Sequence, residues 1–538
     1  MKKSISFSVV AASVAFAFGA SGAAFAAKVP AGVKLDPKQE LVRSNGSEPE
    51  SLDISQIETT TANNIARDLF EGLTAVENTG KIVPGVAASW KQKDPTTWIF
   101  NLRKDAKWSN GDPVTADDFV YSWRRTVDPK TATKYGLFHE FIANGKDIMA
   151  GKKQPSELGI KAIDKNTLEI KTEIPVAFLP DMLANSTMAP LHKASFEKFG
   201  KDFTKPGNLV SNGAYVLKDW IPNSRIVLEK NAKYWDAKNT VITKVTFDPT
   251  ESEDAALKMY KAGQVDMTLR IPAGTFQSLK AEMPKELSAL KNIALYYYGL
   301  NNKDPLLKDK RVRQALSMVV DRDILTQKIL GEGQVPAYSL MVPGTAGADV
   351  TPYDWSKWPM DKRIAEAKKL LAAAGVAPGT QLKLMYNTSE SHKRVGLFIS
   401  SEWKTKLGLN TSMENQEFKV FLKTRHAGQY QVARNGWNAD YNDATTFLDL
   451  VRCDSDQNDQ QYCNKKVDEL IAQGNQQTDQ AKRKTLMTQA SKLAMDDYPL
   501  IPLYQYVQAR TVKPYVGGYF VTNSFDRFRT SDFYIIKK

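Results

Sequence analysis

The stretch TTWIFNLRKDAKWSNGDPVTADDFVYSWRRTVDP, residues 96–129, shows most clearly how this chain folds. Large apolar residues alternate with other residues from Trp98 to Leu102, which is the period of a strand with one buried face. The letters SNGDP that follow predict a turn. Thr115 and Asp118 then form a capping-box pattern, which predicts a helix with an apolar face. A strand, a turn and a helix in so short a stretch indicate a mixed α/β domain.

The same alternation of strand and helix signals continues along the chain without a fixed repeat. The segment NGAYVLKDWIPNSRIVLEKNAKYW (212–235) predicts two strands joined by the turn PNS. Two further segments, 309–330 and 361–375, have the apolar spacing of amphipathic helices, and Gly375 is expected to end the second one. We therefore expect an α/β fold with several lobes.

Length and composition are those of an ordinary globular protein. At 538 residues the chain is expected to form two to four domains, since one core rarely serves so long a chain. Its residues are 42% hydrophobic and 25% charged. Beyond the N-terminal region no apolar run is long enough to predict a membrane span.

Residues 1–26 have the pattern of a signal peptide. Lys2 and Lys3 precede an apolar, alanine-rich run over 5–20, and the letters AFA end at Ala26. We expect cleavage after Ala26. No cysteine lies near this site, so we expect no lipid anchor. The mature protein is then expected to be soluble in the periplasm.

Cys453 and Cys463 are the only two cysteines of the chain, and they lie close together in a polar segment. In an oxidising compartment such a pair predicts a disulfide. A metal site is the alternative reading of two neighbouring cysteines, although no histidine flanks them.

The formal net charge of the chain is +13, and loss of Lys2 and Lys3 with the signal peptide leaves about +11. A positive excess can serve nucleic acid or an anionic membrane. The chain has no long basic block and no nucleic-acid motif, so we interpret the charge as an aid to solubility.

The segment VARNGWNADYNDATTFLD, residues 432–449, places a cation and an anion close together. Arg434 and Asp440 stand six residues apart around Gly436 and Trp437. Six residues of extended chain span at most ~20 Å, which is about the length of a short peptide with a charge at each end.

Several motifs resemble one family in the right order along the chain. They are WSNGDPVTADDFVYSWRR (108–125), NGAYVLKDWIPNSRIVLEKNAKYW (212–235), KRVRQALSMVVDRDIL (310–325) and VKPYVGGY (512–519). Together they resemble the extracellular solute-binding proteins of family 5, the peptide-binding proteins of ABC transporters. The letters YNTSESHKR and ARNGWNADYNDATTFL are most similar to the oligopeptide-binding members.

The resemblance implies two lobes, two hinge crossings and an inserted subdomain. We expect the inserted subdomain at 71–194 and the second lobe at 295–507. The first lobe is expected to combine 27–70, 195–294 and 508–538. The crossings are expected within ALYYYGLNN and PLIPLYQYV.

The resemblance also implies how a peptide would be held. Asp440 matches a residue that pairs with the α-ammonium group, and the backbone of Asn435 to Asn438, around Gly436 and Trp437, matches a strand that bonds the ligand main chain. Other matching residues are expected to complete the site: the first-lobe strand residues Glu58, Thr59 and Thr60, the partners of the ligand carboxylate Arg434, Arg425 and His392, and the pocket walls Tyr135 and Phe418.

Each of these residues also has a plain structural interpretation. Arg425 and His392 can belong to ion pairs within the protein, Glu58 can cap a turn, and Tyr135 and Phe418 can be core residues. The sequence leaves these alternatives open.

Two positions depart from the family pattern. Leu330 stands where the oligopeptide-binding members have a lysine, and Gly299 replaces an acidic residue. These departures leave ligand length and preference open, and they keep a murein-peptide or unusual-peptide specificity open. Separately, murein tripeptide, dipeptide, haem and a metal chelate are alternative ligands of the same fold.

The expected function is the binding of peptides of about two to five residues and their delivery to an inner-membrane ABC permease. We expect a monomer without cofactor, metal, nucleic acid or membrane anchor. An exported peptidase is the rival class, but the chain has four histidines, none in an HExxH motif, and no GxSxG or P-loop.

Overall fold

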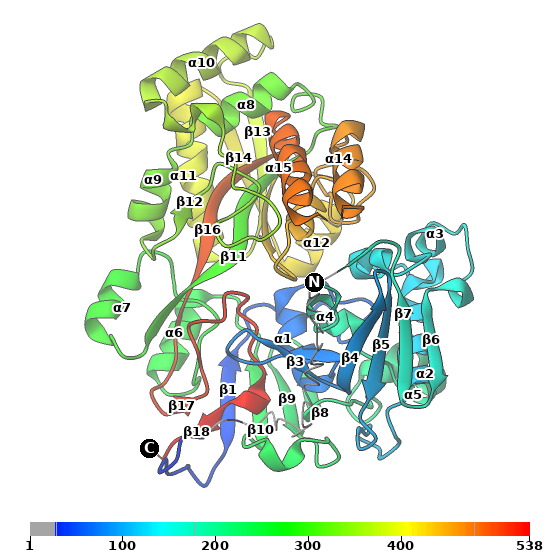
Figure 1. The fold of residues 1–538 in the computed structure, drawn as a ribbon. Coiled ribbons are helices and arrows are strands. Elements are labelled where there is room, and N and C mark those ends of the chain that lie inside the picture. The colour runs from blue at the N-terminus through cyan, green and yellow to red at the C-terminus, as the bar shows by residue number, and fades with distance from the viewer. Residues whose placement is uncertain (1–26, 28, 177, 478, 538) are drawn as a thin grey trace, which may run out of the picture.

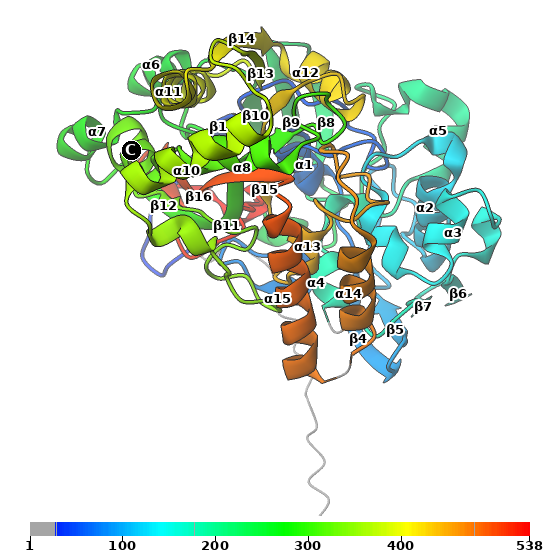
Figure 2. The same ribbon diagram turned by 90° about the horizontal axis from the view of Figure 1, so that it is seen from above.

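The computed structural model describes residues 27, 29–176, 178–477 and 479–537. The signal-peptide prediction for residues 1–26 lies outside this range. Figure 1 shows an upper body and a lower body joined by two long strands, with a further sheet beside the lower body. In the view from above (Figure 2), that further sheet and its helices stand to one side of the rest.

The lower body, which we call the first lobe, is built on a four-stranded sheet with the order β1-β10-β9-β8. Its parallel pair is β1 and β10, and the other neighbours are antiparallel. The elements of this lobe are β1 (Glu40–Ser44), α1 (Thr60–Leu69), β8 (Tyr215–Ile221), β9 (Arg225–Lys230), β10 (Lys244–Asp248), α6 (Glu253–Lys261), α7 (Phe276–Glu282), β17 (Val516–Gly517) and β18 (Tyr534–Ile535). The hairpin of β8 and β9 confirms the two strands predicted around the PNS turn.

The sheet beside it forms the inserted subdomain and has the order β4-β5-β7-β6, all antiparallel. Its elements are β4 (Ala87–Asp94), β5 (Thr97–Leu102), α2 (Ala116–Val127), α3 (Gly145–Met149), β6 (Ile160–Asp164), β7 (Thr167–Lys171), α4 (Leu179–Met182) and α5 (Lys193–Phe199), with the small pair β2 (Thr74–Val76) and β3 (Ile82–Pro84) nearby. The predicted strand and helix are both present, and the capping box of Thr115 and Asp118 begins α2.

The upper body, the second lobe, has a six-stranded mixed sheet with the order β12-β16-β11-β15-β13-β14. Its strands are β11 (Leu287–Leu300), β12 (Val335–Pro336), β13 (Gln381–Asn387), β14 (Asn410–Gln416), β15 (Val432–Asn438) and β16 (Leu500–Thr511). Its helices are α8 (Lys310–Met318), α9 (Arg322–Ile324), α10 (Met360–Ala373), α11 (Glu390–Leu407), α12 (Phe418–His426), α13 (Thr445–Leu448), α14 (Lys465–Asn475) and α15 (Gln480–Asp496).

The strands β11 and β16 are antiparallel to each other, and both extend through the first and the second lobe (Figure 1). Their ladder is interrupted between Lys291 and Leu295, where the register shifts. The two predicted crossings, 294–302 and 499–507, overlap these strands. The four strands of the sheet β1-β10-β9-β8 and the four strands of the sheet β4-β5-β7-β6 lie within their expected segments, whereas β11 and β16 of the six-stranded sheet extend beyond the expected 295–507. The division of the chain into lobes stays a prediction.

The predicted length of one helix was wrong. Residues 309–330 were expected to form one amphipathic helix, but α8 ends at Met318 and Asp321 caps a new start, accepting a hydrogen bond from the N–H of Ile324 at 3.0 Å. The backbone N–H of Asp321 donates instead to Glu402, at 2.8 Å. The break lets Arg322 turn inward, where it is fully buried and donates to backbone carbonyls.

Among the described residues, none of the helices combines the length and the apolarity needed to cross a bilayer.

Candidate functional site

A cavity of about 240 Å³ lies where the first lobe, the inserted subdomain and the second lobe meet. Its walls include residues from all three parts of the chain. Every binding residue predicted from the sequence lines this cavity: Glu58, Thr59, Thr60, Tyr135, His392, Phe418, Arg425, Arg434, Gly436, Trp437, Asn438 and Asp440. The structure thus brings the twelve residues to one place, although their contacts differ from those expected.

Strand β15 presents an open edge to this cavity. Along its whole length it pairs with β11 on one side. On the other side, among the described residues, β13 pairs with it only at Val432 and Ala433. The edge from Arg434 to Asn438 is therefore unpaired, and an extended backbone can add to it.

Gly436 lies at the middle of this edge, and its N–H points away from β11. It donates to the side-chain oxygen of Asn435 at 2.8 Å. A Cβ atom at Gly436 would lie 2.5 Å from the hydroxyl of Tyr506. In this structure the missing side chain at Gly436 leaves room for the hydroxyl of Tyr506.

Tyr506 holds Arg434 at one end of the edge. Arg434 donates to the Tyr506 hydroxyl at 2.7 Å, and its guanidinium carbon lies 5.1 Å from the ring centre of Tyr296. Arg434 is 9% exposed, yet no carboxylate in the described part of the chain lies within ion-pair distance of it. A buried cation without an anion is costly, so this end of the cavity favours a carboxylate.

Asp440 lies at the other end, just beyond β15. Its carboxylate accepts hydrogen bonds from Tyr135, from Asn185 at 3.4 Å and from Arg527 at 3.3 Å. Burial raises the pKa of Asp440 to about 6, although the charge of Arg527 and the hydrogen bond from Tyr135 act in the opposite direction. The carboxylate is therefore ionised at neutral pH, and Arg527 is its ion-pair partner within the protein.

Trp437 and Asn438 lie between these two ends. The indole N–H of Trp437 donates to Thr446 at 3.0 Å, and the ring packs against that of Tyr135. Asn438 donates to the hydroxyl of Thr60, at 3.3 Å, across the gap between the lobes. Both side chains thus already have partners within the protein, so the unpaired edge of the β15 main chain is the part that a ligand can bind.

The residues Glu58 to Thr60 do not form the expected strand. Thr59 is the N-cap of α1, and Thr60 is the first residue of that helix. The N–H groups of Glu58 and Thr59 both donate to the carboxylate of Glu50, at 2.6 and 3.0 Å. The prediction of a first-lobe strand is therefore wrong. The side chain of Thr59 caps the N-terminus of α1, so the chain enters a helix at this point.

The side chain of Glu58 takes part in a link between the lobes. Both of its oxygens lie 3.0 Å from Nε2 of His426, at the end of α12. Nδ1 of His426 lies 2.7 Å from Asp459, which also pairs with Arg425 at 2.6 Å. Burial alone would lower the pKa of His426, but the hydrogen bonds and charges of Asp459 and Glu58 raise it to about 9.

This network favours the structural interpretation of Arg425, and its role toward a ligand stays a prediction. Its guanidinium is buried, is paired with Asp459, and donates to Asn435 at 3.0 Å. An arginine held by an internal carboxylate is a structural residue first, so we place Arg425 among the groups that position β15.

His392 is not a source of positive charge here. Burial, and then the nearby charges of Arg434 and Arg270, hold its pKa well below the ordinary 6.5. Its Nδ1 lies 3.3 Å from the hydroxyl of Tyr296. His392 was expected to be a partner of the ligand carboxylate, and in this structure it lines the cavity as a neutral hydrogen-bonding group.

Phe418 and Tyr135, the two predicted aromatic walls, differ in role. Phe418 packs against a small core cluster that includes Phe421 and Ala433. Tyr135 is 5% exposed and donates to Asp440. Tyr135 is therefore a polar member of the site as well as a wall.

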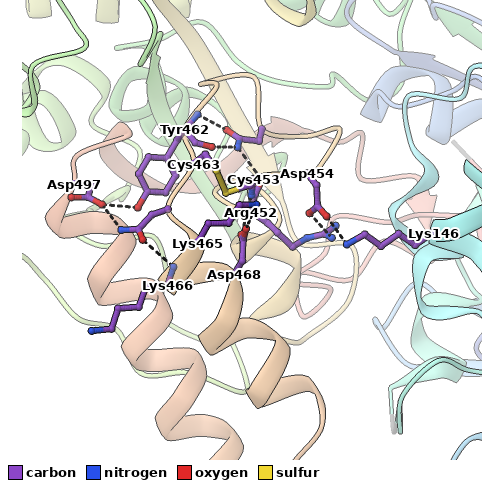
Figure 3. Close-up of a disulfide and its surroundings, with 12 residues drawn as sticks. Lys146, Arg452, Cys453, Asp454, Tyr462, Cys463, Lys465, Lys466, Asp468 and Asp497 are labelled. Carbon is purple, nitrogen blue, oxygen red and sulfur yellow. Dashed lines mark hydrogen bonds and ion pairs between the residues drawn. A yellow bond between two sulfur atoms is a disulfide. The ribbon is translucent and has the colours of Figure 1, made fainter. Parts of the chain in front are cut away.

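The disulfide of Cys453 and Cys463 closes a loop that carries part of the site. Figure 3 shows this bond beside the start of α14, where the Cys453 N–H donates to Asp468 at 3.0 Å. The carboxylate of Asp468 and both sulfur atoms could surround an ion, but sulfur atoms bonded to each other are not thiolate ligands. The disulfide prediction is confirmed, and the two cysteines are therefore not available as ligands of the alternative metal site. The loop itself carries Asp459.

Residues next to this loop also contact the inserted subdomain. Arg452 pairs with Glu140 at 2.5 Å, and Asp454 pairs with Lys146 at 2.5 Å (Figure 3 draws the second pair). The disulfide thus stabilises a segment that joins two parts of the molecule.

Sequence reasoning missed several residues of the cavity. Arg527, in the C-terminal segment, and Asn185, in the inserted subdomain, both reach Asp440. Arg270 lines the same cavity from the first lobe. Each lies in a stretch without a recognisable motif, so no local signal distinguishes it from an ordinary surface residue.

The two departures from the family pattern lie away from the cavity. Leu330 is 3% exposed and belongs to the hydrophobic core. Gly299 is in β11, where a Cβ atom would meet Gln460 and Tyr430 at ordinary contact distance. Neither residue is among those that line the cavity.

Two solved structures of the murein tripeptide-binding protein MppA show how the lobes are placed. The structure from Escherichia coli has a TM-score of 0.92 and 40% identity, and covers 94% of this chain and 100% of that chain. The unliganded open form of MppA, also 40% identical, covers 95% of this chain and 99% of that chain, but its TM-score is 0.67. At alike identity and coverage, the lower TM-score indicates that this chain differs in overall arrangement from that open form.

Sequence comparison agrees with the geometry. The periplasmic oligopeptide-binding protein OppA of Escherichia coli (strain K12) is 46% identical over 535 residues, which cover 98% of this chain and 98% of OppA. A solved structure of OppA from Burkholderia pseudomallei has a TM-score of 0.92 and 52% identity, and covers 94% of this chain and 100% of that chain. The family model for bacterial extracellular solute-binding proteins, family 5 Middle, matches residues 81–459. The chain therefore belongs to the bacterial extracellular solute-binding proteins of family 5.

Proposed function

We propose that this protein binds short peptides between its lobes in the periplasm and delivers them to an ABC importer of the inner membrane. The observation that carries the proposal is the open edge of β15, with Arg434 at one end and Asp440 beyond the other. The similarity to OppA supports peptides as the solute. We propose a monomeric binding protein without catalytic residues or cofactor.

The positions of the two charges set the direction of the ligand. The α-ammonium group pairs with Asp440, and the carboxylate pairs with Arg434. The ligand then runs antiparallel to β15 and bonds the main chain of the edge, whatever its side chains are. Tyr135 and Asn185 complete the ammonium end.

The length of the open edge sets the length of the ligand. The four steps from the Cα atom of Arg434 to that of Asn438 rise about 14 Å along a strand. From its ammonium nitrogen to its carboxylate carbon, an extended tripeptide or tetrapeptide spans roughly 10–14 Å. Within the expected range of two to five residues, we therefore propose that three and four are preferred.

Three of the remaining predicted residues form contacts between the two lobes. Thr60 and Asn438 join the lobes, and Glu58 pairs with His426 across the same gap. These contacts require the lobes to be close together, so they add to the ligand's own contacts in favour of closure. The division of the chain into 27–70, 195–294 and 508–538, an inserted 71–194 and a second lobe at 295–507 is part of this proposal.

The test is calorimetry on mature protein that has been unfolded and refolded to remove bound ligand. Trialanine and tetra-alanine are expected to bind more tightly than dialanine and hexa-alanine. A murein tripeptide is the second ligand to titrate, because the MppA structure has the same TM-score as the OppA structure. Binding of the murein tripeptide alone would transfer the proposal to that ligand, and binding of none would refute peptide binding.

A further inference from the structure

A second arginine lies at the carboxylate end of the cavity and comes from the opposite lobe. Arg270 belongs to the first-lobe segment between α6 and α7 and lines the cavity with Arg434. Both guanidinium groups contact Tyr506. Arg434 donates to the hydroxyl at 2.7 Å, and the guanidinium carbon of Arg270 lies 6.0 Å from the ring centre.

The backbone on both sides of Arg270 is fixed to β16. The N–H of Thr268 donates to the carbonyl of Thr511 at 3.0 Å, and the N–H of Ile271 donates to that of Ala509 at 3.2 Å. The side chain of Gln508 donates to the carbonyl of Leu269. The position of Arg270 is therefore built into the fold and is not that of a free surface side chain.

The side chain of Arg270 forms no ion pair in the described part of the chain, and its Nε is buried without a hydrogen bond. The carboxylates of Glu253 and Glu332 are near enough to interact electrostatically with Arg270, but neither lies within ion-pair distance of its guanidinium. Glu253 accepts hydrogen bonds from the hydroxyls of Ser389 and Ser391, and Glu332 accepts one from Gln334. Burial, and then the charge of Glu253, raises the pKa of Glu332 to about 8.

His392 does not change this balance, because it is neutral. The cavity end therefore holds two permanent cations, Arg434 and Arg270, and none of the carboxylates of the described residues lies within ion-pair distance of either. The single terminal carboxylate of a peptide can pair with one of them in good geometry and leaves the other uncompensated. A ligand with two carboxylates at this end compensates both.

We propose that Arg270 is a specificity-determining residue that binds a second carboxylate of the ligand, so that the protein prefers peptides whose last residue is glutamate or aspartate. The inference rests on the proposed peptide binding. It adds a preference that the open edge of β15 does not supply, since main-chain recognition is indifferent to side chains.

The test compares Ala-Ala-Glu with Ala-Ala-Gln, which differ by one charge, on ligand-stripped protein at pH 7. Calorimetry of the wild type is expected to give an affinity for Ala-Ala-Glu at least about tenfold higher, as a charge-assisted pair in a buried site supplies. In Arg270→Gln the ratio is expected to fall to about one, and in Arg270→Lys, which keeps the charge, to an intermediate value.

Arg394→Gln is the matched control. Arg394 is an exposed arginine whose Nη1 lies 2.4 Å from where a Cβ on Gly274 would stand, so it removes a charge from the same neighbourhood without lining the cavity. This variant is expected to keep the wild-type ratio. Circular dichroism checks that every variant is folded.

The inference is overturned if the wild type shows no preference for Ala-Ala-Glu, or if Arg270→Gln keeps the preference. Trialanine, titrated in parallel into the wild type, separates this failure from that of the proposed function. Binding of trialanine with equal affinities for the other two peptides overturns the role of Arg270 alone. Absence of binding of all three peptides overturns peptide binding itself.

Discussion

Replacing Asp440 by asparagine exchanges a buried carboxylate for a neutral group of nearly the same shape. In the folded protein without ligand, the pKa of Asp440 is about 6, against an ordinary 3.8. Burial raises it, so the folded state favours the protonated form, and ionisation above pH 6 destabilises the fold. A difference of about two pH units corresponds to about 3 kcal/mol, reached in full above pH 6 and absent below 3.8.

Asp440→Asn is therefore expected to stabilise the ligand-free protein and to weaken peptide binding. At pH 7 the free energy of unfolding should rise by up to about 3 kcal/mol, as measured by urea denaturation. Loss of the partner of a buried ammonium group should cost ~3–5 kcal/mol in binding, or at least about a hundredfold in Kd for trialanine.

The pH dependence supplies a control within the same pair of proteins. Binding to the wild type requires the ionised carboxylate, so the affinity for trialanine at pH 5 should be about tenfold lower than at pH 7. Asp440→Asn should lose this dependence. The reasoning is refuted if the variant is less stable than the wild type and binds trialanine equally well.

Three further predictions concern the groups around the site. The pKa of His426, raised from 6.5 to about 9, means that its stabilising pairs are complete below pH 6.5 and lost as the pH rises through 9; the wild-type Tm should fall over that range, and that of His426→Gln should not. Gly436→Ala places a methyl group against the hydroxyl of Tyr506 and should destabilise the fold by about 1–3 kcal/mol and weaken trialanine binding; unchanged denaturation and calorimetry would argue against this packing. Replacing both Cys453 and Cys463 by serine should lower the free energy of unfolding by about 2–3 kcal/mol in urea, and an unchanged midpoint would contradict it.

Local patterns predicted the elements well where neighbouring residues decide the structure. The strand ending at Leu102, the capping box at Thr115 and the helix end at Gly375, which has a φ of +72°, all depend on groups within a few residues. The helix break at Asp321 could not be predicted in this way. It depends on Glu402, which is distant in the sequence.

The site shows the same division. The resemblance identified residues that all line one cavity, because matching motifs fix which positions of the chain correspond to the binding site of the family. It could not show which charged side chains are already paired with other residues of the protein. Asp459 pairs with Arg425, and His426 pairs with Glu58, across long sequence separations. Arg270 was missed because the sequence does not show that its guanidinium forms no ion pair among the described residues, and the proposed role of Arg270 depends on this.

The central claim is that a peptide binds by its main chain along β15 with its α-ammonium group on Asp440. The most direct measurement is calorimetry of the ligand-stripped wild type with trialanine and with N-acetyl-trialanine. Acetylation removes the positive charge and leaves the rest of the peptide unchanged. We predict tight binding of trialanine and a loss of at least about a hundredfold on acetylation. Equal affinities for the two peptides would contradict the account.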